Sequence, residues 1–115
     1  MASAKAAFPL WRKTSVINRQ RYLFELQRVI KDSMDQLAAQ ITLDTGKTTA
    51  DARGDVLRGL QVVEHACNIT SLQMGETIEG VATDMDLYSI RQPLGVVAGI
   101  TPFNFPAMIP LWVSD

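Results

Sequence analysis

The sequence predicts an α/β fold in which helices occupy most of the chain and strands follow them. From residue 22 to residue 41, apolar side chains recur every three or four positions, which is typical of amphipathic helix. Residues 96–100 are all apolar or glycine, as in a strand that a parallel sheet buries on both faces. These two patterns divide the chain into a helical part, 15–75, and a strand and hairpin part, 76–101.

The composition fits one small globular domain, because 47% of the 115 residues are hydrophobic and 20% are charged. Residues 1–31 carry seven basic side chains and one acidic side chain, although the net charge of the chain is only −1. Such asymmetry is found in arms that bind nucleic acid or membranes, and also on solvated helix faces. The helical spacing of the apolar residues favours a solvated face, so we expect no nucleic-acid or membrane partner. The single cysteine excludes a disulfide framework and a multi-cysteine metal site.

We expect a break in the helical region near Asp32. Ser33 and Gln36 have the spacing of a capping box, which predicts a second, shorter helix after the break. Gly46 is a natural stop for this second helix, because a glycine readily adopts the left-handed conformation that ends helices.

A third helix is expected to begin at Thr48 or Thr49 and to run to about Met74. Gly54 and Gly59 each weaken a helix by about 1 kcal/mol relative to alanine, so we expect close packing against a neighbour at both positions. The side chains expected on the buried face are Val56, Leu57, Leu60, Val63 and Cys67.

Beyond Gly75 the helical pattern ends. Residues 77–84 indicate a loop with room for a short strand, and residues 85–91 alternate as a strand does. We expect the start of a helix at 107–112, with Pro106 in its first turn. The buried strand at 96–100 requires sheet neighbours and crossover helices that the printed sequence does not supply.

Asn104 stands between Phe103 and Phe105, in a segment that Pro102 and Pro106 bracket. Its carboxamide is the only strong hydrogen-bonding side chain there, and an amide isolated in an apolar frame usually has something specific to bind. A developing oxyanion is one candidate. An asparagine that bonds its own backbone in a turn is the other, and spacing alone leaves both open.

Arg58 falls on or beside the apolar stripe of the third helix, near Leu57 and Leu60. A guanidinium directed into apolar surroundings can hold a carboxylate or a phosphate in bidentate fashion. The alternative is a surface arginine whose stem passes along the stripe, and the residues alone favour this second interpretation.

Two other sequence patterns do not indicate a functional site. Residues 46–48 match the end of a phosphate-binding P-loop, but Ile41 stands where that motif requires glycine. His65 and Cys67 are two residues apart on a helix and face different sides, so they cannot share a metal or form a catalytic pair.

The segment Pro-Phe-Asn-Phe-Pro at 102–106, preceded by Pro-Leu-Gly-Val at 93–96, resembles the proline- and asparagine-containing motif of the aldehyde dehydrogenase superfamily. Most members of that superfamily have tryptophan where this chain has Phe103. A longer likeness, from about residue 4 to residue 112, is to one branch, the CoA-acylating methylmalonate-semialdehyde dehydrogenases. The stretches that carry it are 54–67, 75–77, 84–89 and 107–110, together with Phe103.

The resemblance implies the amino-terminal helices and first strands of a Rossmann-like NAD-binding domain, here incomplete. It implies that Asn104 is the oxyanion donor, within a cofactor and oxyanion loop at 100–106. It also implies that Arg58 binds the substrate carboxylate, which replaces the surface interpretation above. The residues expected to lie along NAD near the nicotinamide are Ile100, Thr101, Pro102 and Phe103.

The function implied by the resemblance is the conversion of methylmalonate and malonate semialdehyde, with NAD and CoA, to propionyl-CoA and acetyl-CoA. This is a reaction of valine and pyrimidine (thymine) catabolism, placed in the mitochondrial matrix in a eukaryote and in the cytoplasm otherwise. The basic opening superficially resembles a transit peptide, but its apolar spacing continues into the helical part, so we take it as part of the fold. The family also implies a homo-oligomer, a tetramer built as a dimer of dimers.

The catalytic cysteine of the family and most of its nucleotide-binding domain correspond to positions beyond residue 115. Residues after Trp112 depart from the family pattern. We therefore expect this chain to be an amino-terminal portion of the enzyme that is inactive in isolation. The alternative is a non-catalytic module that docks on full-length subunits.

Overall fold

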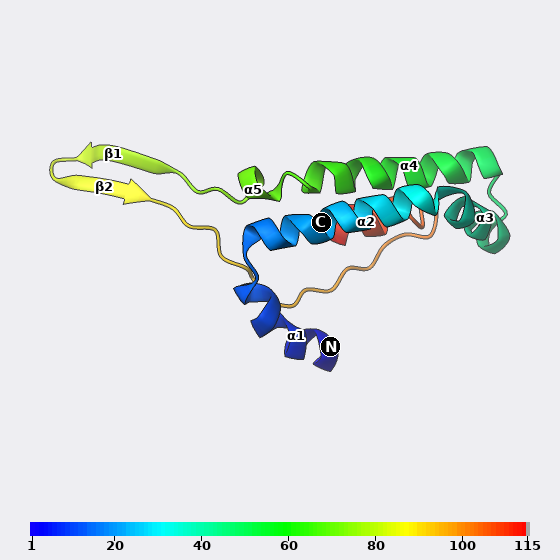
Figure 1. Cartoon of the computed structure of the whole chain (residues 1–115), viewed down its shortest axis with the longest axis horizontal. Helices are drawn as coiled ribbons and strands as arrows, with labels where there is room; N and C mark the ends of the chain where they lie inside the picture. Colours follow the sequence, from blue (N-terminus) through cyan, green and yellow to red (C-terminus); the bar gives the residue numbers. More distant parts are fainter. Residues whose placement is uncertain (115) are drawn as a thin grey trace.

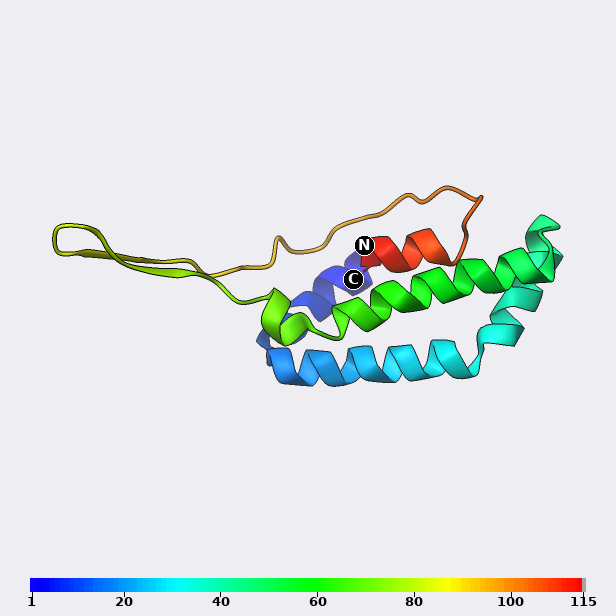
Figure 2. The ribbon, with the colours of Figure 1, turned by 90° about the horizontal axis from the view of Figure 1, so that it is seen from above.

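A computed structural model describes residues 1–114, which form an elongated helical bundle with a β-hairpin projecting from one end (Figures 1 and 2). The overall dimensions are 64 × 31 × 25 Å. No helix within these residues is long and apolar enough to cross a membrane. The elements are α1 (Ala2–Lys13), α2 (Val16–Asp32), α3 (Met34–Thr45), α4 (Thr49–Ala66), α5 (Ile69–Leu72), β1 (Thr77–Ala82), β2 (Met85–Tyr88) and α6 (Met108–Ser114).

Local capping determines where the main helices begin and end. The side chain of Ser15 accepts a hydrogen bond from the Asn18 N–H at the start of α2, and Thr48 does the same for Asp51 at the start of α4. Gly46, with φ of 72°, ends α3 in the left-handed conformation. The expected break at Asp32 and stop at Gly46 are therefore confirmed.

The expected capping box at Ser33 does not form, because the Ser33 side chain makes no cap hydrogen bond. Its φ and ψ are −101° and 9°, whereas a capping side chain needs extended backbone to reach the following N–H groups. The Ser33 N–H bonds to Val29 and its carbonyl accepts from Leu37, so the chain passes from α2 into α3 through nearly helical backbone.

The core lies along α4, which packs against α2, α3 and α6 and runs between α2 and α6 in Figure 2. Val56, Leu60 and Val63 recur with helical spacing and form its buried stripe. Each such side chain contributes roughly 1.5–3 kcal/mol when it is fully removed from water. The whole cluster comprises Ile30, Ala38, Ile41, Ala52, Val56, Leu60 and Val63.

Two expectations for α4 were wrong in detail. The helix ends at Ala66, and a turn separates it from the short α5, so it does not run unbroken to Met74. Leu57 is 45% exposed, because it lies about 100° around the helix from Val56, which points into the core.

The two glycines of α4 differ. A Cβ at Gly59 would lie 2.6 Å from Leu111 Cδ1 and 3.3 Å from Met108 Cα, so the expected close packing is confirmed there, against α6. A Cβ at Gly54 would meet nothing within 4 Å, so the same expectation for Gly54 was wrong. The separation of five residues turns the helix by about 140°, which moves Gly54 away from α6.

Helix α1 was missed by the expected helical part, 15–75. Its apolar spacing continues into α2, but the helix itself buries no residue. The rings of Trp11 and Tyr22, 5.8 Å apart between centroids, connect it to α2.

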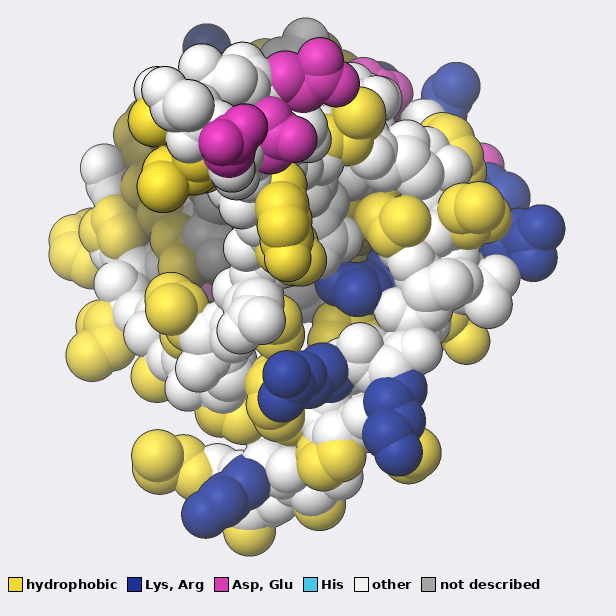
Figure 3. Space-filling model, turned by 90° about the vertical axis from the view of Figure 1, so that its left-hand side faces the viewer, with side chains coloured by type: hydrophobic (Ala, Val, Ile, Leu, Met, Phe, Trp, Pro, Cys, Tyr) yellow, Lys and Arg dark blue, Asp and Glu magenta, His cyan; other side chains and the backbone are white. Residues whose placement is uncertain are grey.

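The hairpin pairs β1 and β2 antiparallel, with Thr77 opposite Tyr88 and Ala82 opposite Met85. The strand expected at 85–91 is thus shorter than predicted. Residues 77–84, where we expected a loop with room for a short strand, supply its partner. Every residue of both strands is exposed. Viewed from the hairpin end, hydrophobic side chains are scattered over the surface among acidic and basic groups (Figure 3).

The prediction of a buried strand at 96–100 was wrong for the described residues. This segment forms no strand, Val97 is 74% exposed, and Ile100 is fully exposed. A buried parallel strand needs hydrogen-bonded neighbours and covering helices, whereas the strands within residues 1–114 pair only with each other. Helix α6 begins at Met108, so Pro106 lies in the turn before the helix and outside its first turn.

Candidate functional site

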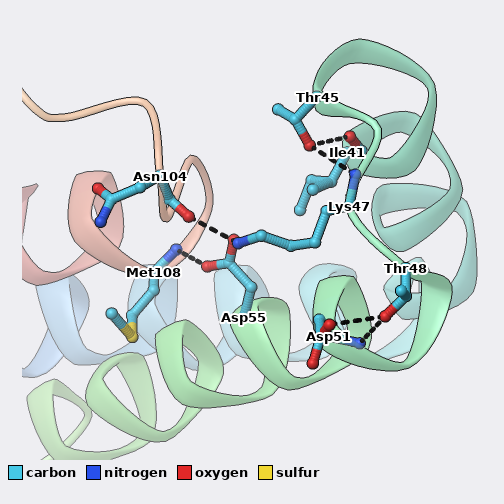
Figure 4. Close-up of polar contacts among 8 residues, drawn as sticks. All are labelled: Ile41, Thr45, Lys47, Thr48, Asp51, Asp55, Asn104 and Met108. Carbon is cyan, nitrogen blue, oxygen red and sulfur yellow. Dashed lines mark hydrogen bonds and ion pairs between the residues drawn. The ribbon is translucent and has the colours of Figure 1, made fainter.

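The loop that carries Asn104 is a turn between the open segment 96–102 and α6. Phe103 and Asn104 are exposed, while Phe105 and Pro106 are half-buried. Among the described residues, the Asn104 side-chain amide makes no hydrogen bond, so the alternative of an asparagine bonded to its own backbone is not formed. The amide and the backbone carbonyl of Asn104 point to different sides of the loop (Figure 4).

Asp55 anchors this loop from α4. Its side chain is fully buried, and its Oδ1 accepts a 2.8 Å hydrogen bond from the N–H of Met108, the first residue of α6. A carboxylate at this position satisfies an N–H that has no partner within the helix and complements the helix dipole. The other oxygen, Oδ2, lies 3.4 Å from Lys47 Nζ, which gives the buried charge a counter-ion (Figure 4).

Lys47 reaches the same loop from the connection between α3 and α4. Its Nζ donates a 2.6 Å hydrogen bond to the carbonyl oxygen of Asn104 and lies 4.5 Å from the centre of the Phe105 ring. Thr45 fixes the backbone at Lys47, because its hydroxyl donates to the Ile41 carbonyl and accepts from the Lys47 N–H (Figure 4). Lys47 therefore bridges a buried carboxylate, a carbonyl and an aromatic face.

Asn104 and Arg58, far apart in the sequence, line one open depression of about 340 Å³. Arg58 projects from α4 at the third position after Asp55, on the helix face that meets the loop. No hydrogen bond or ion pair within residues 1–114 engages its guanidinium. Lys47 is already paired with Asp55, so Arg58 is the lining cation that is available to an anionic ligand.

The other residues singled out in the sequence lie elsewhere. Ile100, Thr101, Pro102 and Phe103 do not line the depression, and Ile100 and Phe103 are almost wholly exposed. Cys67 is buried at the end of α4 whereas His65 is exposed, so they face different sides as expected.

Sequence reasoning missed Lys47 and Asp55. Lys47 drew attention only through the rejected P-loop pattern. Asp55 offered a usable signal, because it is an acidic residue within the stripe formed by Ala52, Val56 and Gly59, and a buried charge requires a partner.

A larger groove of about 430 Å³ lies between α2, α3 and α6. Its lining is mostly apolar, with Gln40, Asp44 and Thr45 as the polar members. These groups come from a single helix and do not converge with a second charged element, so the depression beside Asn104 is the better candidate for chemistry.

Known proteins are similar to this chain over nearly its whole length. Residues 1–114 match the sequence profile of the aldehyde dehydrogenase family. The chain is 63% identical over 113 residues to the methylmalonate-semialdehyde/malonate-semialdehyde dehydrogenase (acylating), mitochondrial, of Homo sapiens, and 62% identical over 111 residues to the corresponding protein of Aedes aegypti. These matches cover 98% and 96% of this chain, but each covers 21% of the relative.

Solved structures agree in fold. A methylmalonate-semialdehyde dehydrogenase from Oceanimonas doudoroffii superposes with a TM-score of 0.91 at 42% identity, over 96% of this chain and 23% of that one. A protein of the same description from Sinorhizobium meliloti, solved in complex with NAD, gives 0.90 at 48% identity with the same coverage. The chain thus spans about a fifth of the length of the relatives that it matches.

Proposed function

The chain belongs to the aldehyde dehydrogenase family, and we propose that it supplies the amino-terminal part of an NAD-dependent dehydrogenase acting on methylmalonate and malonate semialdehyde. The observation that carries this proposal is the depression in which a side-chain amide, Asn104, and a guanidinium, Arg58, occur together. Relatives more than 60% identical to this chain bear the name of that activity.

The substrate class follows from the charge of the depression. A semialdehyde of this kind carries a carboxylate at one end and an aldehyde at the other. The Arg58 guanidinium would bind the carboxylate through charge-assisted hydrogen bonds, because it lines the depression and no ion pair within residues 1–114 engages it.

Asn104 would act at the aldehyde end. Its side-chain N–H groups can donate to the carbonyl oxygen, where negative charge develops when a nucleophile adds to the carbonyl carbon. Cys67 does not serve as that nucleophile, because it is buried at the end of α4 and does not line the depression.

Ile100, Thr101, Pro102 and Phe103 are proposed to lie along NAD. These residues fit a nicotinamide cofactor. Ile100 and Phe103 have exposed apolar side chains close to Asn104 in the sequence, and a flat ring can pack against such a surface. When bound, NAD supplies the acceptor for the hydride of the aldehyde. The Sinorhizobium relative was solved with NAD.

Three further features of the whole enzyme are proposed from its relatives. CoA as acyl acceptor is proposed because the relatives are named as acylating enzymes. The mitochondrial matrix is proposed for a eukaryotic source, since the animal relatives are named as mitochondrial. Assembly as a homo-tetramer, without nucleic acid or membrane partners, is proposed from the sequence resemblance to the superfamily alone.

The substrate assignment is tested by Arg58→Leu in a chimera that joins this segment to the remainder of the human relative. We expect kcat/KM for methylmalonate semialdehyde to fall by about 100-fold or more, while propanal, which has no carboxylate, loses little. Steady-state rates of NAD reduction with both aldehydes measure the ratio.

The matched control is Arg53→Leu. Arg53 lies on the same helix but pairs with Asp35 and does not line the depression, so its loss should leave the ratio unchanged. An unchanged ratio in Arg58→Leu would remove Arg58 from the substrate site.

A further inference from the structure

Two charged residues that take no part in the proposed chemistry hold the Asn104 loop at both of its ends. We infer that Lys47 and Asp55 are positioning residues that fix this loop and thereby set how well the Asn104 amide meets the substrate oxygen. The inference rests on the proposed function for its catalytic consequence, although the anchoring itself is a property of the fold.

Asp55 holds the far end of the loop. It is completely buried, and its Oδ1 receives the Met108 N–H at 2.8 Å, so the first turn of α6 is tied to α4. Gly59 lets α6 approach α4 closely at the same point, because a Cβ there would be 3.3 Å from Met108 Cα. The start of α6 is thus fixed by a hydrogen bond and by close packing.

Lys47 holds the near end. Its Nζ donates to the carbonyl oxygen of Asn104 itself at 2.6 Å and lies against the Phe105 ring. This bond fixes the peptide plane that follows Asn104 and leaves the side-chain amide without a partner in the described residues. The 3.4 Å contact between Lys47 Nζ and Asp55 Oδ2 joins the two anchors into one unit.

The segment before the loop gives no comparable support. Within residues 1–114, positions 92–103 take part in no backbone–backbone hydrogen bond, and Phe103 is 88% exposed. The orientation of Asn104 therefore depends on the Lys47 and Asp55 contacts. Because an oxyanion donor acts only in a narrow range of geometry, loosening these contacts should lower kcat more than it raises KM.

The test uses Lys47→Met in the chimera with the human relative. We expect kcat with methylmalonate semialdehyde to fall by about 10- to 100-fold, with KM within about 3-fold of its original value. Lys47→Arg, which keeps the charge and the donor groups, should recover most of the lost rate. The matched control is Lys31→Met, on the exposed end of α2, which should leave both constants unchanged.

A double-mutant cycle identifies the route of the effect. If Lys47 acts through Asn104, Lys47→Met should cause little further loss in an Asn104→Ala background. Equal losses in both backgrounds would overturn the inference, because they would mean that Lys47 acts independently of the amide. Asp55→Asn is the second variant, and its loss should likewise disappear in the Asn104→Ala background.

Hydrogen exchange separates this inference from the proposed function. The amides of Met108 and Ile109, which donate to Asp55 Oδ1 and to the Phe105 carbonyl, should exchange faster in Lys47→Met than in the unmodified chimera, whatever substrate the enzyme uses. A chimera that oxidises no semialdehyde, yet shows this faster exchange, would refute the function while supporting the anchoring. Unchanged exchange in both Lys47→Met and Asp55→Asn would overturn the positioning role.

Discussion

Asn104 has an exposed side-chain amide, and its backbone carbonyl accepts a hydrogen bond from Lys47, which lies between α3 and α4. Exposure means that the amide is solvated and incurs no penalty for lacking a protein partner. The same side chain is therefore available to a ligand without the loss of any internal hydrogen bond. This separation between a fixed backbone and an uncommitted side chain is what an oxyanion donor requires.

Replacement of Asn104 by alanine in the chimera should lower kcat by about 100- to 1,000-fold, the usual loss for one oxyanion donor. Substrate KM should change much less, and the melting temperature should stay the same because the side chain makes no hydrogen bond in the described residues. Steady-state kinetics and thermal melting measure the two effects.

Asn68→Ala provides the matched control for Asn104→Ala. Asn68 is also exposed, stands at the start of α5 and makes no side-chain cap bond, so its loss should leave turnover unchanged. A lowered melting temperature with normal turnover in Asn104→Ala would instead mean that Asn104 only shapes its turn.

At the scale of elements, two faces of α4 have different roles. One face carries the core stripe of Val56, Leu60 and Val63, and the neighbouring face presents Asp55 and Arg58 toward the loop. Because one helix supplies both, the position of the candidate site is coupled to the packing of the core. The crossing of α6 over α4 is the contact that makes this coupling possible.

Gly59→Val should lower the free energy of unfolding of the chimera by about 1–3 kcal/mol, because a branched side chain has no room beneath α6. Gly54→Ala, on the same helix with open space around it, should instead raise this free energy by up to about 1 kcal/mol through helix propensity. Denaturant unfolding of both variants measures the difference. Equal effects at the two positions would contradict the close approach of α6 at Gly59.

At the scale of the whole molecule, a compact helical core contrasts with long exposed segments. The hairpin and the open segment 96–102 keep apolar side chains in water, among them Ile78, Val97 and Ile100. Exposed strand edges and apolar surface of this kind favour association with other chains. The helices are therefore the part of the molecule that contributes most to its own stability.

The chain expressed alone should accordingly be at best partly folded. Ordering each residue costs about 1.5 kcal/mol, and the exposed segments bury too little apolar surface to offset that cost. Circular dichroism on heating, with light scattering to follow association, should show a broad transition and oligomers. A sharp, cooperative transition of a monomer would contradict this expectation.

Features that depend on a few neighbouring residues could be predicted from the sequence. The helix starting at Thr49 and the stop at Gly46 follow from capping residues, which act within one or two turns. The family also follows from the sequence, because the motif around Asn104 is contiguous. The predictions for Leu57 and Gly54 were wrong because the residue type alone does not determine which face of a helix a partner helix covers.

The candidate site required the three-dimensional arrangement. Asn104, Arg58, Lys47 and Asp55 lie on separate segments, and they meet only because α6 crosses α4 beside Gly59. No local pattern encodes that crossing, since it depends on packing between residues some fifty positions apart. The wrong prediction for residues 96–100 has the same cause. Their apolar sequence favours a strand, but a strand forms only beside hydrogen-bonded neighbours, which local sequence spacing does not determine.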